Sequence, residues 1–201
     1  MGIDEAGRGC VIGPLFLAAF LIPEEDRLID RLNDLGVRDS KLLLSHRRDE
    51  LARQIKKLAH GYKIAKIAPR LLDKFSINDL EAQFSAKLIN KFSPHRVYLD
   101  APASGRGIHN YCDSIASLCS TAPRLVGANK MDDANVLVAA ASILAKSSRE
   151  QHIRALKKKY GDFGSGYPSD PKTVKWLAGW RKLHGQWPSI VRKKWNTLNG
   201  L

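Results

Sequence analysis

The segment GIDEAGRG at residues 2–9 restricts the fold of this chain more than any other stretch. It starts like a buried strand, yet it places two acids, Asp4 and Glu5, side by side. Neighbouring residues of a strand point to opposite faces, and burying a carboxylate without a partner costs several kcal/mol. The pair therefore marks either a solvated turn or a place where a cation binds. Gly7-Arg8-Gly9 follows at once, and glycine lets a backbone approach a ligand closely.

Apolar and alternating segments predict an α/β domain. The predicted strands are residues 2–6, 14–22, 62–69, 96–102 and 124–129. Helices are predicted over residues 45–59, 77–92, 106–120 and 132–160. Ser45 and Asn78 are the candidate N-caps, and Glu81 completes a capping box after Asn78. This order predicts one compact α/β domain with a helical C-terminal extension.

Length and composition are those of a globular protein. The chain has 201 residues, of which 44% are hydrophobic and 26% are charged. The longest apolar stretch, VIGPLFLAAFLIP at 11–23, contains Pro14 and is shorter than the roughly 18 residues needed to cross a bilayer. We therefore expect a buried strand there and no membrane association. Cys10, Cys112 and Cys119 cannot all pair and form no CxxC motif, which favours reduced thiols and a cytoplasmic location.

The chain is strongly basic, with a net charge of +13. A basic balance of this size favours a polyanionic partner such as nucleic acid, although a solvated basic surface is the alternative. The C-terminal stretch carries much of the excess, because no acid follows Asp170 while Lys and Arg continue to the end. All four tryptophans lie in the same stretch. Trp176 and Trp180 share one helix face, so we expect them to pack against the main body.

Acidic residues recur where the predicted strands end. Asp4 and Glu5 end the first strand, Asp100 ends the fourth, and Asp132 or Asp133 opens the helix after the fifth. In open α/β sheets the functional crevice lies outside the carboxyl ends of the strands. An oxygen-only cluster there suits Mg²⁺ or Mn²⁺, and two ions about 4 Å apart can activate water against a phosphodiester. The alternative is that these acids are ordinary turn and helix-cap residues.

Five segments in a fixed order resemble ribonuclease HII, the type 2 ribonuclease H, and the last is most similar to its archaeal branch. They are GIDEAGRGCVIGPL at 2–15, DSK at 39–41, YLDAP at 98–102, NKMDDANVLVAAASILAKSSRE at 129–150 and GSGYPSDP at 164–171. The chain departs from the family pattern at Cys10, commonly Pro, and at Asn129, often His. Asp133 adds an acid beside the matching Asp132.

The resemblance implies roles for particular residues. The four metal-binding catalytic acids would be Asp4, Glu5, Asp100 and Asp132. The backbone of Gly7, Arg8 and Gly9 would contact the ribose 2′-hydroxyl, which distinguishes RNA from DNA. Tyr167 would contact the same hydroxyl and stack at the RNA–DNA junction. Residues similar to phosphate-binding positions are Lys41, Lys146 and Arg149.

The resemblance also implies a fold and an activity. The fold would be ribonuclease H-like, a mixed five-stranded sheet flanked by helices with a helical C-terminal extension. Residues 1–160 would form the catalytic domain, and 161–201 the substrate-sensing loop and the basic, Trp-rich extension, together one compact unit. The enzyme would cut the RNA strand of RNA/DNA hybrids and cut 5′ of ribonucleotides in duplex DNA. Two Mg²⁺ or Mn²⁺ ions would activate water and leave 3′-hydroxyl and 5′-phosphate ends.

The sequence leaves two alternative functions open, and it also gives two expectations about partners. One alternative is another nuclease of the same superfamily, such as a junction resolvase. The other is a non-catalytic basic protein that binds nucleic acid. We expect a monomer. The tail VRKKWNTLNGL does not indicate a sliding clamp as a partner, because it contains no clear clamp-binding motif.

Overall fold

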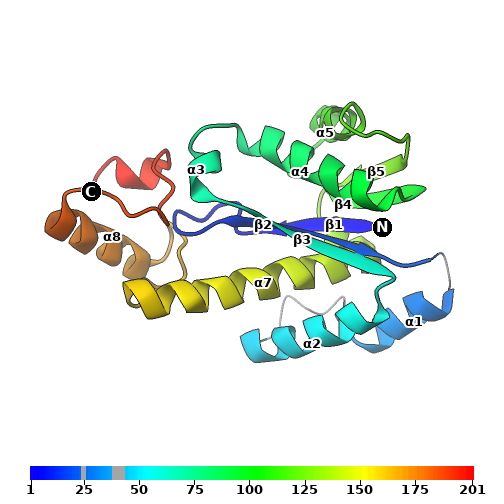
Figure 1. The fold of residues 1–201 in the computed structure, drawn as a ribbon, viewed down its shortest axis with the longest axis horizontal. Coiled ribbons are helices and arrows are strands. Elements are labelled where there is room, and N and C mark those ends of the chain that lie inside the picture. Colours follow the sequence, from blue (N-terminus) through cyan, green and yellow to red (C-terminus); the bar gives the residue numbers. More distant parts are fainter. Residues whose placement is uncertain (24–25, 38–43) are drawn as a thin grey trace.

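A mixed five-stranded sheet forms the centre of the molecule. The computed structural model describes residues 1–23, 26–37 and 44–201, so Lys41 lies outside the described residues. The strands are β1 (Gly2–Ala6), β2 (Leu15–Leu21), β3 (Gly61–Ile67), β4 (Arg96–Asp100) and β5 (Arg124–Ala128), in the order β3-β2-β1-β4-β5. β3, β2 and β1 pair antiparallel, whereas β1, β4 and β5 are parallel. The predicted mixed five-stranded sheet is confirmed (Figure 1).

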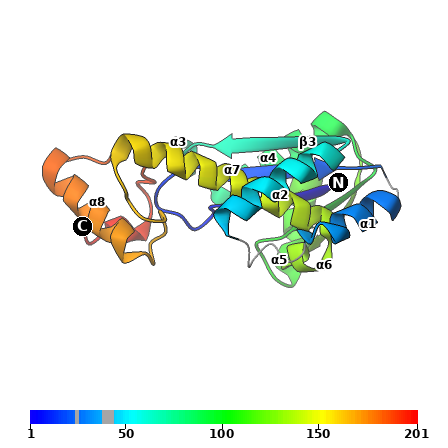
Figure 2. The ribbon, with the colours of Figure 1, turned by 90° about the horizontal axis from the view of Figure 1, so that it is seen from below.

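Helices cover both faces of this sheet. Figure 1 shows α4 (Ile77–Phe92) and α5 (Arg106–Ala116) on one face and α1 (Asp26–Asp34), α2 (Ser45–Leu58) and α7 (Val136–Tyr160) on the other. Figure 2 shows α2 lying alongside α7. The shorter helices are α3 (Pro69–Leu72) and α6 (Met131–Ala134), and α8 (Pro171–His184) lies beyond one end of the sheet. No helix in the described part of the chain has the length and apolar character to cross a membrane.

The central strand β1 alternates between the two helical layers. Gly2 lies against α7 so closely that a Cβ there would be 2.2 Å from the carbonyl carbon of Leu137. Ile3, on the opposite face, belongs to the apolar core beneath α4 and α5. By the same alternation Asp4 faces α7 and Glu5 faces α4. The two acids therefore enter different layers, as the strand geometry predicts.

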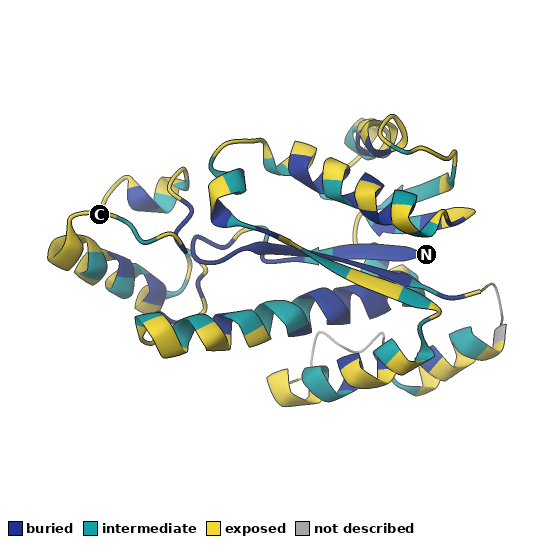
Figure 3. Ribbon diagram, viewed as in Figure 1, coloured by how far each residue is buried: buried dark blue, intermediate teal, exposed yellow. Residues whose placement is uncertain are grey.

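Helix α7 is the main support of β1. Its first half is buried from Val138 to Ala145, and Figure 3 shows burial giving way to exposure along the helix. The predicted single helix 132–160 is wrong, because the chain is extended at Asn135. The Asn135 side chain instead caps α7 and accepts hydrogen bonds from the amides of Leu137 and Val138. Asp132 and Asp133 consequently lie in the separate helix α6.

The two predicted side-chain caps are also wrong. The N-cap of α2 is Leu44 and that of α4 is Ser76, and neither makes a side-chain cap bond. The hydroxyl of Ser45 donates to Glu150 of α7 instead. Asn78 and Glu81 both accept from the Arg8 guanidinium. Partners that are distant in sequence have replaced the local capping bonds.

The C-terminal extension packs against the loop that follows β1. Ile12 pairs with Val191 in an antiparallel bridge, and both are buried in one apolar cluster with Phe163 and Leu177. Trp176 packs as predicted, since its ring lies 5.6 Å from that of Phe163 and its indole N–H donates to the Tyr160 carbonyl.

The contact between β1 and α7 generates a test of stability. Gly2→Ala should lower the free energy of unfolding by about 1–3 kcal/mol, because the new methyl group overlaps the backbone of α7. Gly179→Ala is the matched control, because it lies within helix α8 and its Cβ would meet nothing within 4 Å. It should raise stability by up to about 1 kcal/mol through helix propensity. Urea unfolding measures both, and equal stabilities would contradict the assigned contact.

Candidate active site

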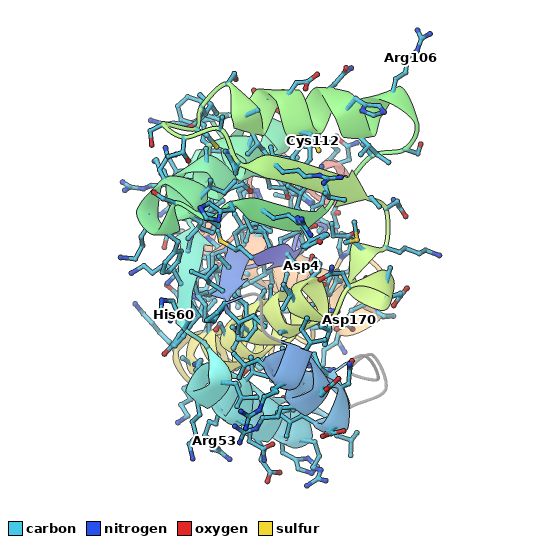
Figure 4. All side chains as sticks on the ribbon, turned by 90° about the vertical axis from the view of Figure 1, so that its right-hand side faces the viewer. Asp4, Arg53, His60, Arg106, Cys112 and Asp170 are labelled. Carbon is cyan, nitrogen blue, oxygen red and sulfur yellow. The ribbon has the colours of Figure 1, made fainter. Side chains whose placement is uncertain are left out.

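The carboxyl ends of β1, β4 and β5 share one edge of the sheet because these three strands are parallel. This edge faces the C-terminal extension and lies opposite the N-terminus in Figure 1. Figure 4 places Asp4 near the middle of the molecule, whereas Arg53 and Arg106 project from its outer helices. Asp4 and Glu5 lie in β1, and Asp100 ends β4, so these acids are near the edge where ligands bind in open α/β sheets.

Asp4 is almost wholly enclosed, with 5% of its surface exposed. One carboxylate oxygen accepts a hydrogen bond from the amide of Glu5 at 2.7 Å. Burial raises the pKa of Asp4 to about 7, and the nearby charge of Asp100 adds to this rise. The Ser142 hydroxyl, the Glu5 amide and the Lys146 charge act in the opposite direction. Asp4 is a buried acid whose charged form is disfavoured by its surroundings.

Glu5 occupies the other face of β1 and shares its surroundings with Glu81 of α4. Burial raises the pKa of Glu5 well above its usual range, and the charges of Asp4, Glu81 and Asp100 raise it further. The guanidinium of Arg8 lowers it. Like charges brought this close favour a bound cation or a proton.

Asp100 and Asp132 are joined to the same edge by α6. Asp100 accepts a hydrogen bond from the Met131 amide at 2.8 Å, which fixes α6 to the end of β4. Asp132 is half-buried and faces α7, where its carboxylate oxygen lies 3.8 Å from the ammonium of Lys146. Asp133 is exposed. Of the two neighbouring acids, Asp132 is the one that turns towards the site.

The arrangement suits a hard cation chemically, although the side chains are not closed around one. Among the residues outside the two undescribed gaps, no three His, Cys, Asp or Glu side chains lie close enough together to hold an ion. The four predicted acids nevertheless supply only oxygen donors, and the pKa values of Asp4 and Glu5 are raised by burial and by like charge. A divalent cation would offset both effects.

The loop after β1 is held from one side by Arg192. Its guanidinium is fully buried and donates to three backbone carbonyls, those of Gly7 at 2.6 Å, Arg8 at 2.7 Å and Gly13 at 2.9 Å. Gly7 has a φ of +91°, a backbone conformation that residues other than glycine rarely adopt. The backbone of Gly7-Arg8-Gly9 is therefore fixed by a residue near the C-terminus.

The same loop is held from the other side by helix α4. The Arg8 guanidinium donates to Glu81, which is fully buried, and to Asn78. The Arg8 side chain is therefore directed towards α4, although it stays partly exposed. Gly9 is the exposed member of the motif, and nothing lies within 4 Å of where its Cβ would be.

The loop at residues 164–167 positions Tyr167 beside the loop after β1. The Gly166 carbonyl accepts hydrogen bonds from the amides of Val11 and Ile12, and the Gly166 amide donates to the Thr173 hydroxyl. The Tyr167 ring is 36% exposed and lies beneath the Arg149 guanidinium, 4.7 Å from its central carbon. The loops bearing Gly9 and Tyr167 are thus side by side although they are far apart in sequence.

A cavity of about 400 Å³ collects most of the predicted substrate-binding residues. Its lining consists of Glu5, Ala6, Gly7, Arg8, Gly9, Arg48, Lys146, Arg149, Glu150 and Tyr167. Sequence reasoning missed Arg48 and Glu150, which form an ion pair on its wall. It also missed the supporting residues Glu81 and Arg192. No local signal marks Arg48 or Arg192, because each lies within a run of basic residues.

Comparison with known proteins finds relatives over nearly the whole chain. The family model for ribonuclease HII matches residues 1–198. The ribonuclease HII of Pyrococcus furiosus is 41% identical over 199 residues, which cover 98% of this chain and 88% of that relative. The crystal structure of ribonuclease H2 from Pyrococcus horikoshii superimposes with a TM-score of 0.91 at 36% identity, covering 99% of this chain and 94% of the other.

A third similar protein was solved together with a partner. The ribonuclease HII of Archaeoglobus fulgidus, solved in a complex with PCNA, has a TM-score of 0.83 at 41% identity. The match covers 98% of this chain and 93% of that one. A relative therefore binds a sliding clamp, the partner that the tail sequence here did not indicate. With a full-length family match and archaeal relatives at about 40% identity, this chain belongs to the ribonuclease HII family.

Proposed function

We propose that this ribonuclease H endonuclease cuts the RNA strand of RNA/DNA hybrids and cuts on the 5′ side of ribonucleotides in duplex DNA. The products would carry 3′-hydroxyl and 5′-phosphate ends. The observation that carries the proposal is the contact between two loops, those of Gly9 and Tyr167, on one wall of the cavity that also holds Glu5. Family membership decides against the two alternatives, a junction resolvase and a non-catalytic binding protein.

The four acids Asp4, Glu5, Asp100 and Asp132 would hold two Mg²⁺ or Mn²⁺ ions. Such ions, when bound, supply an activated water and neutralise charge on the phosphodiester. The protein's part is to position the oxygen donors from β1, β4 and α6 and to present the substrate phosphate. The described residues that line the cavity include no serine, cysteine or histidine. Water is therefore the proposed nucleophile.

Ribose selectivity would come from the two loops. The exposed backbone of Gly9 can approach the sugar, and the phenol of Tyr167 can meet the 2′-hydroxyl. A site built to bind a hydroxyl rejects the analogue that lacks it, because its own polar groups are then left unpaired. We propose Lys146 as a phosphate contact, since it lines the cavity beside these loops. Lys41 stays a predicted phosphate contact.

The C-terminal region and the cellular setting complete the proposal. We propose that residues 161–201 work as one unit with residues 1–160, because Arg192 and Gly166 bond directly to the loop after β1. The enzyme would act as a monomer in the cytoplasm. Its three cysteines are free thiols, consistent with a reducing compartment.

Asp100→Asn should nearly abolish cleavage and leave binding of a hybrid as tight or tighter. The variant loses a charged metal ligand, but its side-chain oxygen can still accept from the Met131 amide, so the fold should survive. Asp113→Asn, an exposed acid on α5, is the control and should retain wild-type turnover. Single-turnover cleavage and hybrid titration measure the two effects. Turnover above about a tenth of wild type would remove Asp100 from the catalytic set.

The buried acids should make the metal-free protein less stable as pH rises. The folded-state pKa of Asp4, about 7, lies above its ordinary value of 3.8. The contribution of protonated Asp4 to the free energy of unfolding is therefore complete below about pH 4 and is lost as pH rises through about 7. Asp4→Asn should gain stability relative to wild type between about pH 5 and about pH 8 when no divalent ion is present.

Thermal unfolding with a chelator measures this difference. Mn²⁺ at the higher pH should raise the unfolding temperature of wild type and have little effect on Asp4→Asn. Parallel pH profiles for the two proteins would show that Asp4 does not titrate as described.

Tyr167→Ala should lower cleavage of a duplex with one embedded ribonucleotide more than cleavage of a continuous hybrid. Neighbouring 2′-hydroxyls in the hybrid can partly substitute for the lost contact. Tyr167→Phe, which keeps the ring, should lose less, and wild type should leave the all-DNA duplex intact. Initial rates on the three substrates provide the test. Wild-type rates for Tyr167→Ala on both ribonucleotide substrates would refute the role of this side chain.

A further inference from the structure

Arg149 of α7 contacts both loops that the proposed function assigns to the ribose. One guanidinium nitrogen donates to the thiol of Cys10 at 3.0 Å and to the carbonyl of Ser165 at 2.8 Å. The guanidinium plane also covers the ring of Tyr167, with 4.7 Å between its central carbon and the ring centroid. Its stem packs on Gly7, where an added Cβ would lie 2.9 Å from the Arg149 side chain.

These contacts use the features that distinguish arginine from lysine. A planar guanidinium can stack on an aromatic ring while its N–H groups donate sideways. A lysine ammonium could supply the same charge to a phosphate, but it could not cover the ring and reach two acceptors in one plane. One nitrogen and one face of the Arg149 guanidinium are thus engaged within the protein, whereas Lys146, on the preceding turn of α7, lies beside Asp132.

The position of the Tyr167 ring depends on this support. The ring is partly exposed, and its loop turns through two glycines of positive φ, Gly164 at +74° and Gly166 at +81°. A packing partner on the face of such a ring restricts its orientation, in addition to the hydrogen bond between the Tyr167 hydroxyl and Cys10. Arg149 is that partner, and the same side chain rests on Gly7 at the start of the other loop.

We propose that Arg149 is a positioning residue that fixes the spacing between the Gly7–Gly9 backbone and the Tyr167 ring. It thereby sets the preference for a single ribonucleotide within DNA, and it is not primarily a phosphate contact. This inference rests on the proposed function, because it concerns how the same site recognises ribose. It replaces the phosphate-binding role predicted for this residue from the sequence.

Two substitutions separate positioning from charge. Arg149→Lys keeps the charge but loses the planar stack, and Arg149→Met keeps the length of the stem but loses the charge. Both should lower cleavage of the single-ribonucleotide duplex by about 10- to 100-fold, because a misplacement of about 1 Å at a reacting centre has an effect of that size. Cleavage of the continuous hybrid should fall much less, and it reports that the variants are folded. The loss should appear in kcat more than in KM.

Arg154→Lys is the matched control. Arg154 lies on the same helix, but its guanidinium bonds to Asp49 and Ser45 of α2. Its substrate preference should equal that of wild type. Arg149→Met should also leave the salt dependence of binding unchanged, whereas removal of a phosphate contact reduces the slope by about one.

A double-mutant comparison tests the route of action. If Arg149 acts through Tyr167, then Arg149→Lys added to Tyr167→Ala should cause no further change in substrate preference. Additive losses would overturn the proposal. The proposal would also be overturned if Arg149→Lys behaved like wild type while Arg149→Met lost activity and showed a flatter salt slope. That result would assign a phosphate contact to Arg149. An equal loss on both substrates would exclude a role in selectivity.

Failure of the proposed function would be seen in the wild type and not in the variants. In that case the wild-type enzyme would not cleave the single-ribonucleotide duplex. In that event crystal structures of wild type and Arg149→Lys still decide the inference, since the Tyr167 ring should move away from the Gly7 loop only in the variant.

Discussion

The buried guanidinium of Arg192 is the interaction on which the site depends. Each of its three hydrogen bonds goes to a backbone carbonyl of the loop after β1. Leaving such a group buried without acceptors would be strongly unfavourable, so the loop and the C-terminal segment must fold against each other. The loop backbone is thereby set before any substrate arrives. Preorganised backbone groups need no rearrangement when a ligand binds, and this favours selective recognition.

Charge is distributed so that the centre of a basic protein stays acidic. The chain carries +13 overall, yet Asp4, Glu5, Asp100 and Glu81 share one end of β1. Burial raises the pKa of Asp4, Glu5 and Glu81, and neighbouring carboxylates raise the pKa of Asp4 and Glu5 further. Arg8 and Arg192 face this cluster, but both make bonds that hold the loop in place. The remaining imbalance suits divalent cations, which would let the site accept a phosphate that the carboxylates alone would repel.

Local sequence rules failed where a distant partner competed for the same side chain. Asn78 and Glu81 form a good capping pattern, but both bind Arg8, because the fully buried carboxylate of Glu81 needs a positive partner more than an exposed helix end needs a cap. Ser45 likewise bonds to Glu150. Hydrophobic periodicity did not reveal the break at Asn135, because the residues of α6 and α7 together form one continuous polar-then-apolar run. The residue that caps α7 is the same Asn135 that ends α6.

The five strands, the family and the acids at the strand ends were predictable from the sequence, because alternation and ordered motifs are local properties of a chain. The opposite orientation of Asp4 and Glu5 was predictable too, since it follows from strand geometry alone. The contacts of Arg8 with α4, of Arg192 with the loop after β1 and of Arg149 with Tyr167 became visible only in the folded structure. These contacts join residues up to 185 positions apart, and their geometry depends on the packing of α7, α4 and the C-terminal extension around one sheet edge.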